Sequence, residues 1–214
     1  MKRILLPFLL LFLLPSLANA QVLPVLLPEG AYTDSDNAAN AISPRPGNRA
    51  KFRQMINATL MNNPRNVAAL SQRAYMFMEG GDADRAKRDY DMALLHAEPG
   101  SAYERHVLWS RGWASYELGD YAAAHSDWQR AIVLHGRRPF WAAYSLALLY
   151  WTTGQHDVAL QWYGTAVLSN PEWGSGEGMA ELTEHWSPPQ QARVRALFAR
   201  WSEGRPLTAT PAGP

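Results

Sequence analysis

Apolar and polar residues follow a helical spacing over most of the chain, and one arrangement of them recurs three times. In each copy a Gly is followed, at fixed distances, by an Ala, a large aromatic residue and a second Ala. The copies are Gly81, Ala86, Tyr90 and Ala93; Gly119, Ala124, Trp128 and Ala131; and Gly154, Ala159, Tyr163 and Ala166. A frame shared at intervals of 38 and 35 residues indicates stacked structural repeats.

Each copy predicts a pair of antiparallel helices that reverse at the Gly. Gly readily adopts the positive φ of a tight turn, so the chain can fold back on itself there. The two Ala residues lie seven positions apart on one face of the second helix, where they let neighbouring helices approach closely. The aromatic residue fills the space that the alanines leave. Pro99 and Pro171 are expected to end the second helix of the first and third copies, and Gly136 with Pro139 that of the second.

This frame resembles the tetratricopeptide repeat, a helix–turn–helix unit of about 34 residues. Three copies fit, at about 67–100, 105–138 and 140–173, and the first is the weakest because Phe77 stands where the family usually has Tyr. The resemblance implies an all-α fold, a tetratricopeptide-repeat solenoid of antiparallel helix pairs with a C-terminal capping helix. It covers about half of the chain and constrains the fold rather than the function, because the family is defined by packing positions.

The residues before the repeats predict an export signal and a lead-in. Residues 1–20 hold two basic residues, an apolar run and an Ala-Asn-Ala motif, the layout of a signal peptide cleaved after Ala20. Residues 21–48 contain four prolines and are expected to be extended or disordered, followed by an N-terminal helix within 49–66. We interpret the apolar start of the lead-in, Val22–Leu27, as leftover hydrophobicity beside the processing site, with a docking strand or a partner-binding segment as the alternative.

The residues after the repeats predict a cap. Residues 174–203 are expected to form a short helix and then a longer one, which Ser187 begins and which covers the exposed apolar face of the last repeat. On the longer helix an apolar stripe lies opposite a row of arginines; the stripe is Val194, Leu197, Phe198 and Trp201, and the row is Arg193, Arg195 and Arg200. Residues 204–214 are expected to be disordered.

Composition narrows the compartment and the partners. The chain has no Cys, which excludes disulfides, a lipid-modified cysteine and thiolate chemistry. An exported chain without disulfides suits a bacterial periplasm, with secretion as the alternative. Without Lys2 and Arg3, 18 basic residues stand against 19 acidic ones, which is far from the positive charge that nucleic acid binding needs. We also expect no stable membrane span once the signal is removed.

The sequence contains no motif for catalysis, for a metal or for a cofactor. The six His residues lack metal-ligand spacing, no Ser lies in a nucleophile elbow, and the Gly-rich segment 174–178 lacks the flanking elements of a phosphate loop. Glu181 and Glu184 lie one helical turn apart, which a solvated helix face explains. We therefore expect no enzyme and no metal or cofactor site.

The family resemblance implies a binding groove on the first helix of each copy, at the positions that line the concave surface. Seven of the fifteen groove positions are Trp or Tyr, although a face that only meets water would be polar. The candidate groove residues are Tyr75, Met78, His106, Trp109, Trp113, Tyr116, Trp141, Tyr144 and Trp151. A patch of rings usually marks a binding surface. Packing between neighbouring first helices, or Val22–Leu27 folding back into the groove, would instead make these rings part of the interior.

These observations predict an exported scaffold or adaptor that holds a protein or peptide segment in its aromatic groove, within an assembly of the cell envelope. The carboxylate clamp by which some family members hold a peptide terminus is not implied, because the matching positions are aromatic or acidic. Carbohydrate also stacks on such rings, so an accessory module that binds cell-wall glycan is the alternative function. A homo-oligomer in which the groove meets a second copy is a third alternative.

Overall fold

The protein is helical in the residues that its computed structural model describes, 22–42 and 48–204, where one isolated bridge takes the place of a sheet. The expected signal peptide and the tail from residue 205 lie outside these ranges. The helices are α1 (Asn37–Asn40), α2 (Arg49–Asn62), α3 (Val67–Glu79), α4 (Ala83–His96), α5 (Ala102–Glu117), α6 (Tyr121–His135), α7 (Phe140–Thr152), α8 (His156–Ser169), the 3₁₀ helix η1 (Pro171–Gly174), α9 (Gly176–Leu182) and α10 (Pro188–Glu203). The all-α fold class is confirmed.

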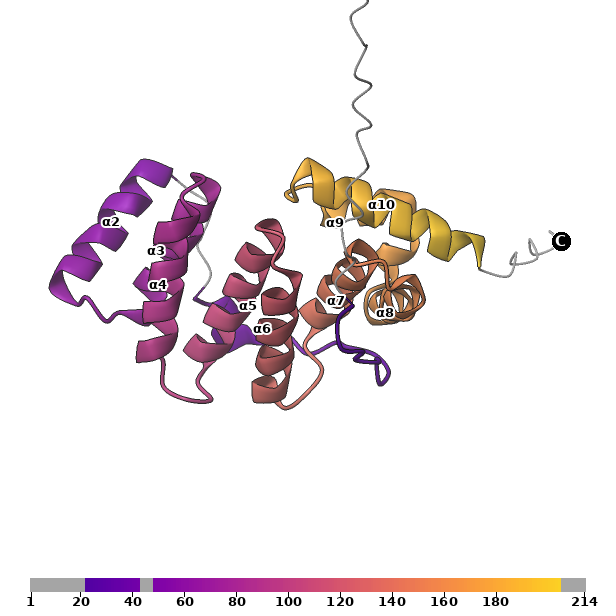
Figure 1. The fold of residues 1–214 in the computed structure, drawn as a ribbon, viewed down its shortest axis with the longest axis horizontal. Coiled ribbons are helices and arrows are strands. Elements are labelled where there is room, and N and C mark those ends of the chain that lie inside the picture. Colours follow the sequence, from indigo (N-terminus) through magenta and orange to yellow (C-terminus); the bar gives the residue numbers. More distant parts are fainter. Residues whose placement is uncertain (1–21, 43–47, 205–214) are drawn as a thin grey trace, which may run out of the picture.

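Six helices form three consecutive pairs, α3 with α4, α5 with α6 and α7 with α8 (Figure 1). Each pair reverses at the expected residue, and Gly81, Gly119 and Gly154 have φ angles of 78°, 79° and 81°. Asp82 and Asp120 precede the second helices of the first two pairs, and each side chain accepts a hydrogen bond from a backbone N–H of the first turn. The stacking of helix pairs that the repeated frame predicts is therefore present.

The aromatic residue of the repeated frame lies in the interior of every pair. Tyr90, Trp128 and Tyr163 are at most 1% exposed, and the six alanines of the frame are at most 2% exposed. The second pair holds the largest ring, and it has room only because residue 112 is Gly. A Cβ on Gly112 would lie 2.3 Å from the indole nitrogen of Trp128. The corresponding residue of the first and third pairs is Ala, opposite a smaller Tyr ring.

A charged bridge joins the two helices of the first pair and of the second. Arg73 makes a bidentate ion pair with Asp89, at 2.6 and 2.8 Å, and Arg111 makes the same pair with Asp127, at 2.7 Å for both bonds. In both pairs the Arg stands eight residues before the turn Gly and the Asp eight residues after it. Planar guanidinium and carboxylate groups match in this geometry, so each bridge fixes the spacing of its two helices.

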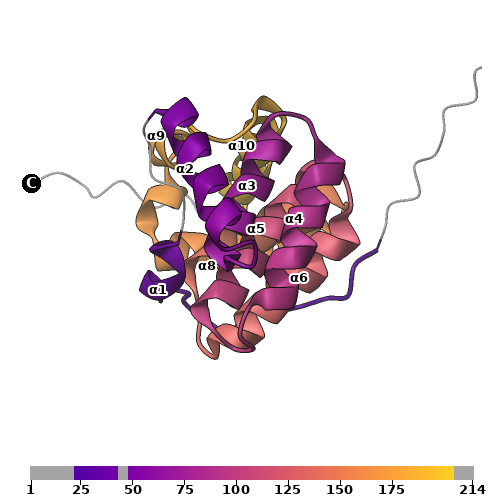
Figure 2. The ribbon, with the colours of Figure 1, turned by 90° about the vertical axis from the view of Figure 1, so that its left-hand side faces the viewer.

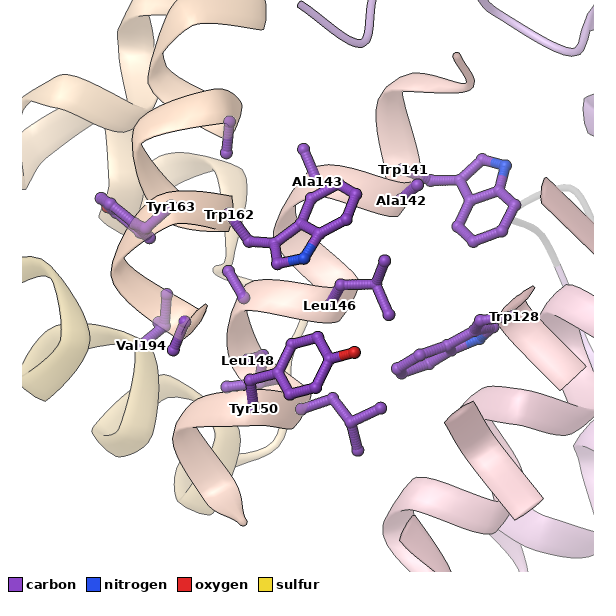
Figure 3. Close-up of a cluster of buried hydrophobic side chains, with 14 of the residues drawn as sticks. Trp128, Trp141, Ala142, Ala143, Leu146, Leu148, Tyr150, Trp162, Tyr163 and Val194 are labelled. Carbon is purple, nitrogen blue, oxygen red and sulfur yellow. The ribbon is translucent and has the colours of Figure 1, made fainter. Parts of the chain in front are cut away.

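The third pair lacks this bridge. Its residues at the same two positions are Leu146 and Trp162, both fully buried. They belong to the hydrophobic cluster drawn in Figure 3, which joins the second pair, the third pair and α10. The outer seam of the third pair is therefore apolar where the other two pairs are charged.

Residues 22–42, which we call the strap, pack against the array. Leu23 and Tyr32 are 2% and 6% exposed and belong to the cluster of the second and third pairs. Val22–Leu27 is therefore an extended segment docked on the array, and the interpretation as leftover hydrophobicity is wrong. Its prolines keep the strap extended as expected, with the single turn of α1 as its helical part.

The strap runs from the third pair back towards the first, and it passes from the side of α6 to α1 on the opposite side of the array (Figure 2). Asp34 forms an isolated bridge with Pro139 in the turn between α6 and α7. Asp36 then begins α1 and makes a bidentate ion pair with Arg105 of α5, at 2.5 and 2.9 Å. These contacts hold α1 across the first helix of the second pair.

Helices α9 and α10 close the array at its third pair. Ser187 begins α10, as the sequence predicts, and it forms a capping box with Gln190. Val194 and Leu197 of the expected apolar stripe are at most 2% exposed. The row of arginines differs from the expectation at one position, because Arg193 turns inward and donates to the hydroxyl of Tyr116 at 2.9 Å. A buried Tyr hydroxyl needs a polar partner, and the long Arg side chain reaches it.

Candidate functional site

The nine candidate groove residues lie on α3, α5 and α7, the first helices of the three pairs, but they do not form one open surface. Tyr75 is 45% exposed, whereas His106, Tyr116 and Trp141 are 4%, 1% and 7% exposed. The other five are partly buried. Two further parts of the chain, α1 and the region of α9 and α10, cover much of the predicted groove.

Helix α1 covers the beginning of α5 and α7. His106, Trp109 and Trp141 line a cavity of about 20 Å³ together with residues of α1, which is room for little more than one water molecule. Burial lowers the pKa of His106 to about 4, against the opposing effects of a hydrogen bond with the Ala39 backbone and the charge of Asp36. His106 is therefore neutral near pH 7, and this part of the predicted groove belongs to the interior.

Trp186, in the turn between α9 and α10, reaches the other end of the groove. Its ring centroid lies 5.5 Å from that of Trp113 and 5.8 Å from that of Tyr144. Trp173 of η1 stacks on Tyr144 at 5.4 Å with 24° between the ring planes, and it lies 6.0 Å from Trp186. Four rings from separate elements therefore form one cluster, which includes two of the candidate residues.

A hollow of about 210 Å³ adjoins this cluster. Its lining comes from α7, the end of α8, η1 and the α9–α10 region: Phe140, Tyr144, Ala166, Ser169, Asn170, Trp173, Leu182, His185 and Trp186. Phe140 is 41% exposed, so an aromatic ring of the lining is accessible from outside. Burial raises the pKa of the Tyr144 hydroxyl, which has no hydrogen-bond partner among the described residues and stays a neutral donor. The hollow can bind an apolar group, and the Tyr144 hydroxyl can donate one hydrogen bond to a polar atom next to that group.

Tyr116 has a structural use. Its hydroxyl lies 2.7 Å from the Oγ1 of Thr152 and accepts a hydrogen bond from Arg193. The same guanidinium lies over the Tyr116 ring, 5.7 Å from its centroid. Burial raises the pKa of Tyr116. This residue therefore ties α5 to α7 and α10 and is not available to a ligand.

The remaining candidates lie apart from the hollow. Tyr75 is exposed beside Glu79, and its pKa is raised first by burial and then by that carboxylate. Met78 packs against the cluster of the first pair. The ring of Trp151 packs against that of His156 with the planes tilted by 33° and the centroids 4.3 Å apart. The structure thus brings Tyr144 to the hollow and Trp113 to the ring cluster beside it, and leaves these three elsewhere.

Sequence reasoning missed Phe140, Trp173 and Trp186 as parts of the site. Phe140 and Trp173 stand at the two ends of the third repeat, outside the expected groove positions, and Trp186 lies in a region expected only to cap the array. No local pattern marks Trp186, because its position depends on how α9 packs against η1. In contrast, a helix start rich in rings (Phe140, Trp141, Tyr144) was a usable signal for the first of the three.

The described residues contain no group of three His, Asp or Glu side chains placed to hold a metal ion. Within ranges 22–42 and 48–204, no helix has the length and apolar character to cross a membrane. No protein-family model, curated protein or solved structure matches the chain. Its function must therefore be argued from the geometry of the site.

Proposed function

We propose that this protein is an exported scaffold of the tetratricopeptide-repeat type that binds a protein segment in the hollow beside Tyr144. The observation that carries the proposal is the convergence of Tyr144, Trp173 and Trp186 on a hollow that the exposed ring of Phe140 makes accessible. Such rings give a large contact area at a low cost in conformational entropy, and Trp and Tyr dominate the binding energy of many protein interfaces.

The size of the hollow favours one or two side chains of a longer segment. Small-molecule sites usually have volumes of about 300–1,000 Å³, and this hollow has about 210 Å³. An apolar or Pro-rich segment fits the rings, and the Tyr144 hydroxyl can donate to a backbone carbonyl of that segment. The partner would be another protein of the cell envelope, because the expected signal peptide and the absence of Cys favour a periplasmic location.

A carbohydrate ligand is the second candidate. The stacked planes of Tyr144 and Trp173 suit a sugar ring, and Ser169 and Asn170 lie in the same lining. However, the Oγ of Ser169 already bonds to the Tyr32 N–H and the Thr165 carbonyl. The Asn170 side-chain oxygen accepts from the Glu172 N–H. With these polar groups engaged, the site has few donors and acceptors for sugar hydroxyls, which favours the protein segment.

Cross-linking in cells tests the proposal. A photoreactive amino acid would replace Phe140, and in a matched control it would replace Tyr103, which is 47% exposed at the start of α5. We expect one partner protein cross-linked from position 140 and absent from position 103. A purified fragment of that partner should then bind the unaltered chain, and Phe140→Ala should weaken binding by about tenfold, the loss typical of one aromatic contact.

The outcomes separate the alternatives. The same cross-linked products from both positions, or none from position 140, would contradict the protein-binding function. Binding to isolated peptidoglycan that Phe140→Ala abolishes and Tyr103→Ala preserves would establish the carbohydrate function. A cross-linked product of twice the chain's own mass would identify a second copy as the partner.

A further inference from the structure

Three residues of the third helix pair differ from their counterparts in both other pairs and bond to the strap. The residue after the turn Gly is Gln155 in place of Asp82 and Asp120. Trp162 stands where the other pairs have the Asp of the charged bridge, and Tyr150 stands four residues before the turn Gly, in place of Phe or Ser. Each of the three brings a polar group to the otherwise apolar surface formed by α6, α7 and α8, which we call the seam.

Gln155 gives up a structural role to contact the strap. Asp82 and Asp120 cap their helices, whereas Gln155 makes no side-chain cap for α8. Its amide instead accepts from the Leu23 N–H at 2.8 Å and donates to the Leu23 carbonyl at 2.9 Å. One side chain thus satisfies both backbone groups of one strap residue, as a neighbouring β-strand would.

Tyr150 and Trp162 continue this contact along the strap. The Tyr150 hydroxyl accepts from the Leu26 N–H at 2.9 Å and donates to the Pro24 carbonyl at 2.8 Å. The indole N–H of Trp162 donates to the Leu26 carbonyl at 2.7 Å. Together with Gln155, these side chains bind five backbone groups of an extended segment.

Only a few strap side chains are recognised. Leu23 is buried, whereas Val22, Val25 and Leu27 are 78%, 59% and 52% exposed. Leu26 packs partly against the cluster, and Tyr32 meets Trp162 edge to face at 5.1 Å. The seam therefore recognises an extended backbone with leucines three residues apart. It tolerates variation at the exposed positions of Val22, Val25 and Leu27.

We infer that this seam, formed by α6, α7 and α8, is a peptide-binding site that the strap occupies within the same chain and that a partner segment of the same pattern, Leu-Pro-x-Leu in extended form, can occupy in its place. Gln155, Tyr150 and Trp162 do not line the hollow beside Tyr144, and the strap meets that lining only further on, where the Tyr32 N–H donates to Ser169. Its recognition groups lie on α7, on α8 and in the short turn that joins these two packed helices, so the site persists when the strap leaves. The strap acts as an internal competitor. The apparent affinity for a partner is the intrinsic affinity multiplied by the fraction of molecules whose seam is open.

A labelled peptide of residues 22–34 tests this inference by fluorescence anisotropy. The protein is the chain from Gln21, either unaltered or carrying Leu23→Asp and Leu26→Asp to expel the strap. We expect the expelled variant to bind the peptide at least about tenfold more tightly than the unaltered chain, because nearly all of its seams are open. Adding Gln155→Ala should abolish this gain, whereas adding Tyr144→Ala should leave it unchanged and so separate this site from the hollow.

Two controls decide the result. A peptide with Asp at both leucine positions should not bind, and equal binding of that peptide would overturn the inference. So would an expelled variant that keeps its helical circular dichroism and melting transition yet binds no peptide. If that variant loses its melting transition, the unaltered chain is irradiated with a peptide carrying benzoylphenylalanine at the position of Leu26. Cross-links to α6 or α8 are then expected, and their absence would overturn the inference.

Discussion

The second and third helix pairs share one frame and complete it in different ways. The second pair satisfies its own groups: Asp120 caps α6, and Arg111 bridges to Asp127. The third pair leaves α8 without a side-chain cap and buries Leu146 and Trp162 where the bridge would be. The side chains of Gln155, Tyr150 and Trp162 bond instead to the backbone of the strap.

This difference separates two kinds of position in a repeat. The Gly, Ala and aromatic positions determine how two helices pair, and they are alike in all three copies. The positions on the outside of the pair determine what packs there. The charged bridge of the second pair is in contact with water through Arg111, whereas the strap covers the apolar seam of the third pair. The same fold thus provides a solvated face in one repeat and a binding seam in the next.

Among the substitutions, the largest effect on stability is expected from Gly112→Ala in the second pair. The new Cβ would lie 2.3 Å from the Trp128 indole nitrogen, and that ring is fully buried and cannot move aside. We expect a loss of about 3 kcal/mol of unfolding free energy, the upper range for overpacking a core. Urea unfolding followed by circular dichroism measures it.

Gly164→Ala in α8 is the matched control. Its Cβ would stand 3.5 Å from the Trp201 indole nitrogen, an ordinary contact. Ala favours helix over Gly by up to about 1 kcal/mol, so this variant should be as stable as the unaltered chain or more so. A stable Gly112→Ala protein would show that the ring of the second pair is not fixed by that Gly.

A pH dependence is expected next, because His106 lies beneath α1 in the second pair and Trp141 holds the matching place in the third. The pKa of His106 falls from 6.5 to about 4 on folding. Between these two pH values the unfolded chain therefore binds a proton at His106 that the folded protein does not bind. Stability should therefore be lost as the pH falls from about 6.5 to about 4, by up to about 1.4 kcal/mol for each pH unit. The lowered pKa of Asp36 acts in more acidic solution, below its ordinary 3.8.

Urea unfolding at several pH values checks this expectation. His106→Gln should reduce the slope below about pH 6.5, and the part that remains is expected from His125, whose pKa burial also lowers. The same change at the exposed His185 is the control and should leave the slope in place. An unchanged slope in His106→Gln would contradict the assignment of the effect to that side chain.

A smaller effect is expected from breaking the charged bridge of the second pair. Arg111→Leu leaves the Asp127 carboxylate, whose side chain is only 7% exposed, without its main partner. We expect a loss of about 2 kcal/mol, below the value for fully buried pairs because Arg111 is partly solvated. Adding Asp127→Leu should recover most of the loss, because the second pair then has two apolar residues at the positions of the bridge, as the third pair does. No recovery in this double-mutant cycle would show that the two solutions are not interchangeable.

The sequence predicted the parts of this architecture that depend on local spacing. The three turns at Gly, the buried aromatic positions and the start of α10 at Ser187 all follow from residues within one helical hairpin or helix start. The strap and Trp186 could not be placed in this way. The bonds of Leu23 to Gln155 and of Leu26 to Trp162 join residues 132 and 136 positions apart, and no local pattern encodes such a contact.

One signal in the sequence did bear on the strap. Where the repeated frame has Asp, the third copy has Gln155 and Trp162, so its second helix lacks both the cap and the bridge. Such departures in one copy indicate that another segment must satisfy that surface. They do not say which segment does so. The groove could likewise be predicted only in part: its rings lie on the expected helices, but the distant elements α1 and Trp186 determine which of these rings stay accessible.

The smallest effect is expected from Gln155→Asp. Aspartate can cap α8 as Asp120 caps α6, which gains about 1 kcal/mol, while the two bonds to Leu23 are lost, which costs about the same. The unfolding free energy should therefore hardly change, although the strap is loosened. Limited proteolysis at the strap should become faster while the rate within the helix pairs stays the same. Unchanged cleavage of the strap would show that Gln155 does not hold it.

The central claim is that the third pair holds the strap through its departures from the frame, and native-state hydrogen exchange tests it most directly. The amides of Leu23, Leu26 and Tyr32 are compared in the unaltered chain and in a variant with Leu146→Arg and Trp162→Asp. This variant introduces into the third pair the charged bridge of the other two. We predict slow exchange of these three amides in the unaltered chain and fast exchange in the variant, with the amides of α5 and α6 protected in both. Fast exchange of the strap amides in the unaltered chain, or slow exchange that survives in the variant, would contradict the claim.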